Sequence, residues 1–345
     1  MRKSSRVLTS AAISLSLFAA MPANSESVED FYKGKTVTVL VGFGAGGGFG
    51  LYSRTLAEHM GKHIPGHPDL QPQFMPGAGG LKAANYYANV SPDDGSVMAI
   101  VSQTGPLNQR LMTGRDSNIK HDFAKFQWLG RLVTMEAGYV GRVASGLTTV
   151  DALRTQKLNA CAAGKSHQGY INAQSISDAL KLDTNVIVGY PGSKDMMLAI
   201  ERGECNVLAL SLSTWETRGK HLITNKVVAP LMTIHTQRSK FWPDVPTTWE
   251  LAEDPDDKAV LKFIAGYAGV GRAYSLPPGA PADRVAAMQK AFVATYEDPD
   301  FLATVKKRKM PLNPAPGPVV KEHVMETLNA SDQIVARTRK VLDYK

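Results

Sequence analysis

Two stretches of the chain alternate short apolar runs with glycine-containing loops and amphipathic segments. A parallel sheet covered on both faces has strands that are apolar throughout, whereas its helices repeat their apolar positions with a period of 3.6 residues. On this pattern the first stretch has strands at 35–41, 70–75 and 96–101 and helices at 51–63 and 81–89. The second has strands at 158–163, 185–190 and 205–210 and helices ending at 180 and 202. The two series predict two doubly wound α/β lobes built from right-handed βαβ units.

The rest of the chain supplies further elements that connect or cover these lobes. The expected elements are a strand at 227–233, a short helix at 248–252, an extended hinge segment at 266–274, and helices at 282–296, 300–307 and 319–341. We expect the C-terminal helices to cover the first lobe. The predicted division is therefore 26–129 for the first part of lobe 1, 130–268 for lobe 2, and 269–345 for the hinge return and C-terminal helices of lobe 1.

The first 25 residues have the pattern of a secretory signal peptide. Arg2, Lys3 and Arg6 precede an apolar stretch at 7–21, and small residues follow up to Ser25. This order predicts export and cleavage after Ser25. The apolar stretch is shorter than a bilayer span needs and is interrupted by hydroxyl residues, which argues against a membrane anchor.

Charge and cysteine content narrow the possible partners. The formal charge of +8 includes three cationic residues in the signal segment, which leaves about +5 for the mature chain of about 320 residues. Like charges form no block of five, so nucleic acid is not an expected partner, whereas a modest positive field suits an anionic ligand. Cys161 and Cys205 can form a disulfide or remain two buried thiols, and the sequence leaves both open. No cysteine or histidine spacing indicates a metal site.

Glycines gather where the first two predicted strands end. Gly44, Gly46, Gly47, Gly48 and Gly50 follow the first strand, and Gly77, Gly79 and Gly80 follow the second. Ligands of open α/β sheets bind at the carboxyl edge of the strands, where backbone N–H groups at helix starts attract anions. Glycine allows the backbone to approach such a ligand closely. We therefore expect a small carboxylate to bind there without chemical conversion or cofactor.

An alternative interpretation of the first loop is a nucleotide-dependent enzyme. Gly42, Gly44 and Gly47 match the GxGxxG pattern of dinucleotide-binding loops. Such a site also needs an acidic residue at the end of the second strand to bind the ribose, and residues 73–75 are Gln, Phe and Met. This missing acid favours the binding protein over the enzyme.

Several sequence blocks resemble the substrate-binding receptors of tripartite tricarboxylate transporters, the Bug family. They are VGFGAGGGFGLYSRTLAEHM, PGAGGLKAANYYANVSPDDGSVM, GYPGSKDMMLAIERGE, DVPTTWELA and SLPPGAPADRVAAMQKAF, which occur in this order over nearly the whole mature chain. The resemblance implies a Venus-flytrap protein of type II architecture in the periplasm, and we expect it to hold no cofactor or metal. It also implies delivery of an organic acid to a membrane permease by a monomeric receptor. A receptor that presents its ligand to a sensor kinase fits the same sequence.

The resemblance also implies which residues contact the ligand. They are Gly44, Gly46, Gly47, Gly48, Phe49 and Gly50 in the first loop, Gly77, Ala78, Gly79 and Gly80 in the second, Ser102, Gln103 and Thr104 after the third strand, and Ser166, His167, Gln168, Tyr190, Gly192 and Ser193 in the second lobe. Many members have an aspartate near the position of Gly50, and this chain has none. That departure argues against an amino-acid ligand. Phe49 either offers an apolar face to a hydrophobic or aromatic acid or packs at the start of the helix, and the sequence leaves both open.

Overall fold

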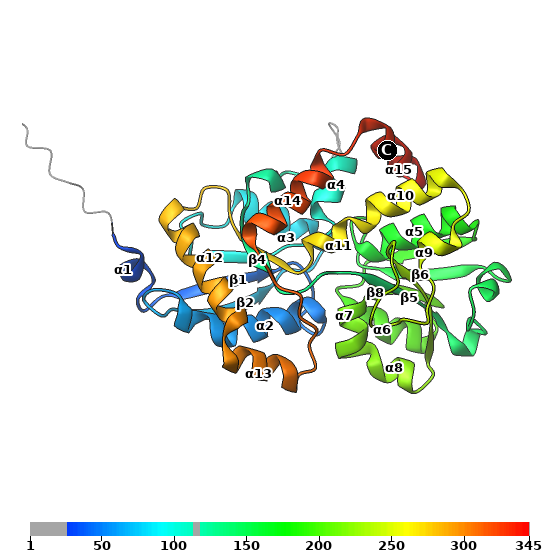
Figure 1. Cartoon of the computed structure of the whole chain (residues 1–345), viewed down its shortest axis with the longest axis horizontal. Coiled ribbons are helices and arrows are strands. Elements are labelled where there is room, and N and C mark those ends of the chain that lie inside the picture. The colour runs from blue at the N-terminus through cyan, green and yellow to red at the C-terminus, as the bar shows by residue number, and fades with distance from the viewer. Residues whose placement is uncertain (1–25, 113–117, 345) are drawn as a thin grey trace, which may run out of the picture.

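The computed structural model describes residues 26–112 and 118–344, so the predicted signal peptide lies outside the described residues. Two lobes, each with its own sheet, lie side by side, with α11 (Tyr267–Val270) between them (Figure 1). Both lobes are α/β, as the sequence pattern predicts. No helix in the described ranges is long and apolar enough to cross a membrane.

The first sheet combines three parallel strands with three that the sequence pattern did not indicate. The strands β2 (Asp69–Phe74), β1 (Thr36–Val41) and β3 (Val97–Ile100) run parallel in that spatial order. Next to β3 lie β10 (Ala273–Leu276), β4 (Gln127–Arg131) and β11 (Ala315–Pro316), each antiparallel to its neighbour. The first sheet is therefore complete only with β10 and β11, which come from the C-terminal part of the chain.

The second sheet repeats the same spatial order in one continuous segment of the chain. The strands β7 (Thr184–Val188), β6 (Leu158–Ala162) and β8 (Val207–Ser211) are parallel. The strand β5 (Ala137–Arg142) then pairs antiparallel with both β8 and β9 (Val228–Ile234). Both predicted three-strand sets are confirmed, and each sheet is mixed because antiparallel strands extend it.

The helices that follow the parallel strands begin at or near the predicted positions. Helix α2 (Gly48–Met60) starts three residues earlier than predicted, inside the glycine-rich loop. The other helices up to residue 265 are α1 (Val28–Tyr32), α3 (Leu81–Asn89), α4 (Gly105–Leu111), α5 (Gln168–Leu180), α6 (Ser193–Arg202), α7 (Leu212–Thr214), α8 (Lys220–Thr224), α9 (Thr248–Leu251) and α10 (Pro255–Ala265).

The predicted extended hinge at 266–274 is wrong in its first half. Residues of α11 are helical there, and β10 begins only at Ala273. Gly271 has a φ of 66° and ends the helical backbone, because few other residues adopt this conformation without strain. A helical turn therefore separates α10 from the strand that re-enters the first sheet.

The predicted single C-terminal helix is two helices. Helices α12 (Ala282–Glu297) and α13 (Pro299–Lys307) are followed by α14 (Gly317–Leu328) and α15 (Asp332–Val341). The Ser331 side chain accepts a hydrogen bond from the backbone N–H of Ile334, and this N-cap starts α15. Helix α14 packs on β4, whereas α15 contacts α10 and α5 beside the second sheet as well as α4. The domain limits given above stay a prediction.

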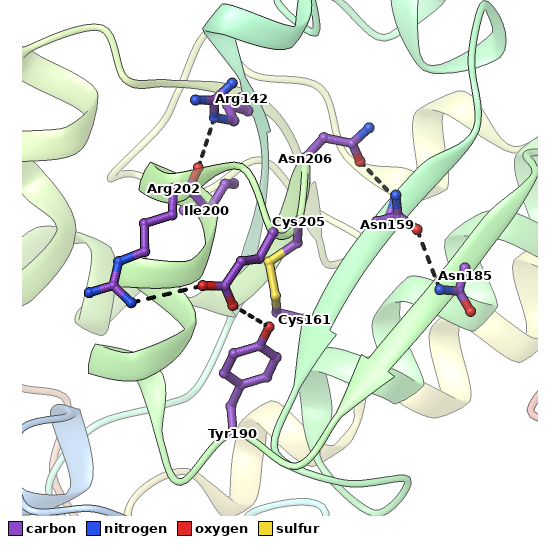
Figure 2. Close-up of a disulfide and its surroundings, with 10 residues drawn as sticks. Arg142, Asn159, Cys161, Asn185, Tyr190, Ile200, Arg202, Cys205 and Asn206 are labelled. Carbon is purple, nitrogen blue, oxygen red and sulfur yellow. Dashed lines mark hydrogen bonds and ion pairs between the residues drawn. A yellow bond between two sulfur atoms is a disulfide. The ribbon is translucent and has the colours of Figure 1, made fainter.

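A disulfide joins Cys161 in β6 to Cys205 just before β8, which resolves the choice that the sequence left open (Figure 2). Its Cα atoms are 6.0 Å apart, within the usual range. Both cysteines are buried in the cluster that includes Trp215 and Trp242. The bridge therefore links β6 to the segment that leads into its neighbour β8 inside the second lobe.

Candidate functional site

The carboxyl ends of the parallel strands of the two sheets meet across the contact between the lobes. The backbone N–H of Gly44 donates to the carbonyl of Pro191 at 3.1 Å. The carbonyl of Ser166 accepts from Thr104 Oγ1 at 2.8 Å and from Asn108 Nδ2 at 2.7 Å. The side chains of Gln103 and Gln168 are also hydrogen-bonded to each other. The lobes are therefore closed on one another at the edge where ligands of such sheets bind.

Glycines allow this close approach at particular positions. A Cβ atom on Gly47 would lie 2.6 Å from Ser193 Oγ, and one on Gly79 would lie 2.6 Å from Ser166 Oγ. A Cβ on Gly79 would also lie 2.7 Å from the backbone N of His167, so a side chain there would push the lobes apart, whereas at Gly47 the Ser193 hydroxyl would have to move. Gly50 is different, because a Cβ there would collide with the carbonyl of Ala45 in its own loop. Glycine is thus needed at position 50 for the conformation of the loop and not for the contact between the lobes.

A small buried cavity of about 20 Å³ remains between the lobes. This volume holds roughly one water molecule. Its lining comes from both lobes and from the segment that connects them, and consists of Phe43, Gly44, Gly47, Gly48, Phe49, Met135, His167, Gln168, Ser193, Leu210, Ser211, Thr214 and Arg272. Any organic molecule must therefore enter while the lobes are further apart.

Arg272 gives this cavity its charge. The residue is 1% exposed, and its Nη2 donates to Thr214 Oγ1 at 2.9 Å and to Ser211 Oγ at 3.2 Å. Its Nε and Nη1 have no hydrogen-bond partner. Within residues 26–112 and 118–344, no aspartate or glutamate forms an ion pair with it. A buried charge without a counter-ion is costly, so the site is electrostatically incomplete.

Aromatic rings hold the guanidinium in place. Its Cζ lies 4.6 Å from the ring centroid of Phe49 and 4.8 Å from that of Tyr52. Such cation–π contacts offset part of the lost hydration. Burial lowers the pKa of Arg272 to about 10, and the phenols of Tyr52 and Tyr274 oppose this effect. The group therefore stays positively charged at neutral pH.

His167 contributes a neutral polar group to the same cavity. Its Nδ1 accepts the backbone N–H of Gly169 at 3.0 Å and caps the start of α5, which assigns the ring proton to Nε2. Burial lowers the pKa of His167 to about 4, so the ring is uncharged at neutral pH. Its ring packs edge-on against Phe43, with centroids 5.7 Å apart. His167 can therefore donate a hydrogen bond but adds no charge.

The residues predicted to bind a ligand fall into three groups. The cavity lining includes Gly44, Gly47, Gly48, Phe49, His167, Gln168 and Ser193. Gly79, Gly80, Ser102 and Ser166 line a second cavity of about 20 Å³ beside His121 and Phe123. The remaining predicted residues line neither of these two cavities and are Gly46, Gly50, Gly77, Ala78, Gln103, Thr104, Tyr190 and Gly192.

Tyr190 belongs to the third group and points toward the disulfide. Its hydroxyl donates to Glu204 Oε2 at 3.1 Å, beside Cys205 (Figure 2). In this closed arrangement the side chain of Tyr190 is hydrogen-bonded within its own lobe, the second.

Sequence reasoning missed several lining residues, above all Arg272. The signal was present, because Arg272 is a lone cation within the apolar, glycine-rich segment 266–276. Ser211 ends β8 and Thr214 follows it, much as Ser102 and Thr104 follow β3, so their place at a strand end also pointed to the cleft. Met135 and Leu210 are apolar residues that the sequence did not distinguish from core.

A larger cavity, of about 710 Å³, lies elsewhere, between α10, α11, α14 and α15. It is an open groove that includes Arg131, Glu136, Lys262 and Glu326. Arg131 donates to backbone carbonyls of Gly269 and Asn313, so its charge has acceptors. We place the candidate site at Arg272 because an unpartnered buried charge indicates a missing ligand more directly than volume does.

No protein-family model and no curated protein sequence matches the chain. Solved structures are similar over nearly its whole length. The periplasmic binding protein BugD is 18% identical with a TM-score of 0.70, and the match covers 90% of this chain and 98% of BugD. MatC from Rhodopseudomonas palustris with bound malate is 19% identical (89% and 99% covered, TM-score 0.68). R. palustris Rpa4515 with adipate is 18% identical (90% and 98% covered, TM-score 0.68). These similarities establish a common fold.

Proposed function

We propose that this protein is an exported solute-binding receptor that captures a small organic carboxylate between its lobes for a permease of the tripartite tricarboxylate type. The observation that carries the proposal is the unpaired guanidinium of Arg272 in a cavity to which both lobes contribute. A carboxylate would supply the missing acceptors and the missing counter-charge in one group.

The contacts between the lobes explain how a bound ligand would favour the closed state of the protein. Ligand groups that contact Gly48 on one side and Ser193 or Thr214 on the other are held only when the lobes meet. A ligand shifts such an equilibrium by its additional contacts in the closed state. Capture without chemical conversion then requires no catalytic group.

The fold and the sequence resemblance support the partner and location. The similar structures include a periplasmic binding protein and proteins with bound malate and adipate. The N-terminal residues have the pattern of a cleaved signal peptide ending at Ser25. We therefore propose a monomeric periplasmic protein that needs no cofactor.

Thermal unfolding of the purified protein with mono-, di- and tricarboxylates tests the ligand class, with a nucleotide and a neutral sugar as controls. We expect at least one carboxylate to raise Tm in proportion to the logarithm of its concentration, as mass action requires. If a nucleotide raises Tm and no carboxylate does, the proposal is wrong. Uptake of the same labelled acid by cells with and without the gene then tests coupling to a permease.

A further inference from the structure

We infer that Arg272 anchors the ligand's carboxylate and that the ligand is a monocarboxylate with an apolar body. This inference rests on the proposed function and specifies which acids the receptor selects. It follows from the hydrogen-bond inventory of Arg272, from the charge balance of the cavity and from the apolar residues around it.

The guanidinium has unused donors that point to an acceptor outside the protein. Of its five N–H groups, those on Nε and Nη1 have no acceptor, while Nη2 reaches three hydroxyls, on Ser211, Ser213 and Thr214. A hydroxyl can reorient and donate to an incoming carboxylate. Arg272 and these hydroxyls therefore form a ready set of donors for one anionic group.

Arg272 lies at the contact between the lobes, and both lobes reach it. Phe49 and Tyr52 of α2 in the first lobe hold its guanidinium, and Thr214 after β8 in the second lobe hydrogen-bonds to it. Arg272 itself directly precedes β10 in the connecting segment. An anion bound to it would contact both lobes, so it would favour their closure.

The charge balance of the cavity restricts the ligand to one negative charge. Of the lining residues described, Arg272 alone carries charge, because His167 is neutral and no acidic residue contributes. A second carboxylate would be buried without a counter-ion. The ammonium group of an amino acid would likewise lack an anionic partner.

The rest of the lining suits a hydrophobic ligand body. The rings of Phe43 and Phe49 stack with centroids 4.4 Å apart, and Met135 and Leu210 complete an apolar wall. Burying an alkyl or aryl group there contributes affinity in proportion to the apolar area removed from water. The expected ligands are medium-chain and aryl-substituted monocarboxylates.

Two matched pairs of acids test this selectivity by titration calorimetry. Hexanoate and adipate share a six-carbon chain and differ by one carboxylate, while 3-phenylpropanoate and phenylalanine differ by one ammonium. We expect each monocarboxylate that binds to do so about 10-fold or more tighter than its partner. Adipate or phenylalanine binding equally well or better would overturn the inference while leaving the receptor function intact. If no carboxylate binds, both proposals fail.

Substitutions at Arg272 test the anchor. For the preferred acid we expect Arg272→Met to weaken binding about 100-fold and Arg272→Lys, which retains the charge, about 10-fold. Arg142→Met serves as the matched control, because Arg142 is partly buried, donates to the carbonyls of Ile200 and Glu201, and lies away from the cavity. It should bind normally.

The stability of the unliganded variants separates an anchor from a structural arginine. Removing a buried charge that lacks a counter-ion should leave the Tm of Arg272→Met unchanged or higher. An Arg272→Met protein that binds as the wild type does, or that loses binding only because its Tm falls sharply, would overturn the assignment.

Discussion

Tyr344 ties the end of the chain to the loop after β6, with its hydroxyl donating to the carbonyl of Lys165 at 2.6 Å. Its ring stacks on Tyr170 at an interplanar angle of 7°. Lys165 neighbours Ser166, whose carbonyl accepts from Asn108 of α4. The C-terminal residues therefore lie beside the contact between the lobes.

Tyr344→Phe should lower the free energy of unfolding by about 1 kcal/mol, because it removes the hydroxyl that donates to Lys165 and Asn108 and keeps the stacked ring. Urea denaturation measures the change. Tyr86→Phe provides the control, since Tyr86 is 39% exposed and should change stability by less than about 0.5 kcal/mol. Equal midpoints for Tyr344→Phe and the wild type would show that the hydroxyl of Tyr344 contributes nothing to the free energy of unfolding.

Gly48→Ala should weaken ligand binding about 10-fold or more. A Cβ at Gly48 would overlap Arg272 Nη2 and lie 2.6 Å from Thr214 Oγ1, so it blocks closure and displaces the guanidinium. In the same loop, a Cβ on Gly44 would meet Pro191 at an ordinary 3.6 Å, which makes Gly44→Ala the matched control. Calorimetric titration of both variants checks the contrast. Similar affinities in the two would argue against closure at Gly48.

Loss of the disulfide should destabilise the second lobe. The cysteines are 44 residues apart in sequence, for which the entropy of the unfolded chain predicts about 4 kcal/mol. We expect Cys161→Ser/Cys205→Ser to unfold at a lower denaturant concentration than the wild type, and a reductant to affect only the wild type. A reductant that lowers the stability of the double variant would contradict this assignment.

Stability should fall as the pH drops from about 6.5 toward 4, partly because of His167. Its folded pKa, about 4, lies below its unfolded value, so the unfolded chain binds more protons in this range. The contribution is present at neutral pH and amounts to at most about 3 kcal/mol. His121, whose pKa burial also lowers to about 4, acts in the same direction.

His167→Asn isolates the share of His167, because asparagine can cap α5 without titrating. We expect a smaller loss of stability between pH 6.5 and 4 than in the wild type, measured by denaturation at each pH. The control is His221→Asn, whose side chain is 61% exposed and should leave the profile unchanged. An unaltered profile in His167→Asn would mean that His167 is not buried neutral.

Much of the fold was predictable because parallel strands and their helices have strong local patterns. The runs at β1 and β6 and the helix α3 follow directly from apolar periodicity. The antiparallel strands β4 and β10 did not stand out, because their place in the sheet depends on partners distant in sequence. The break between α14 and α15 depends on one capping serine within a continuous amphipathic pattern.

The site was predictable in position but not in its central residue. Glycines at strand ends indicated the edge where the lobes meet, since their spacing is local. Arg272 lies more than 220 residues from the first loop, and only the return of the chain to the first sheet brings it against Phe49. Its burial and its lack of an acid are properties of tertiary packing.

Because β10 lies between β3 and β4, the two sheets differ in how much of the chain each needs in order to form. Residues 137–234 contain every strand of the second sheet and both cysteines, so that sheet and its disulfide can form without residues 273–276. The first sheet has a gap at its centre until residues 273–276 arrive. The half that begins the chain therefore depends on residues near its end, whereas the sheet of the other half does not.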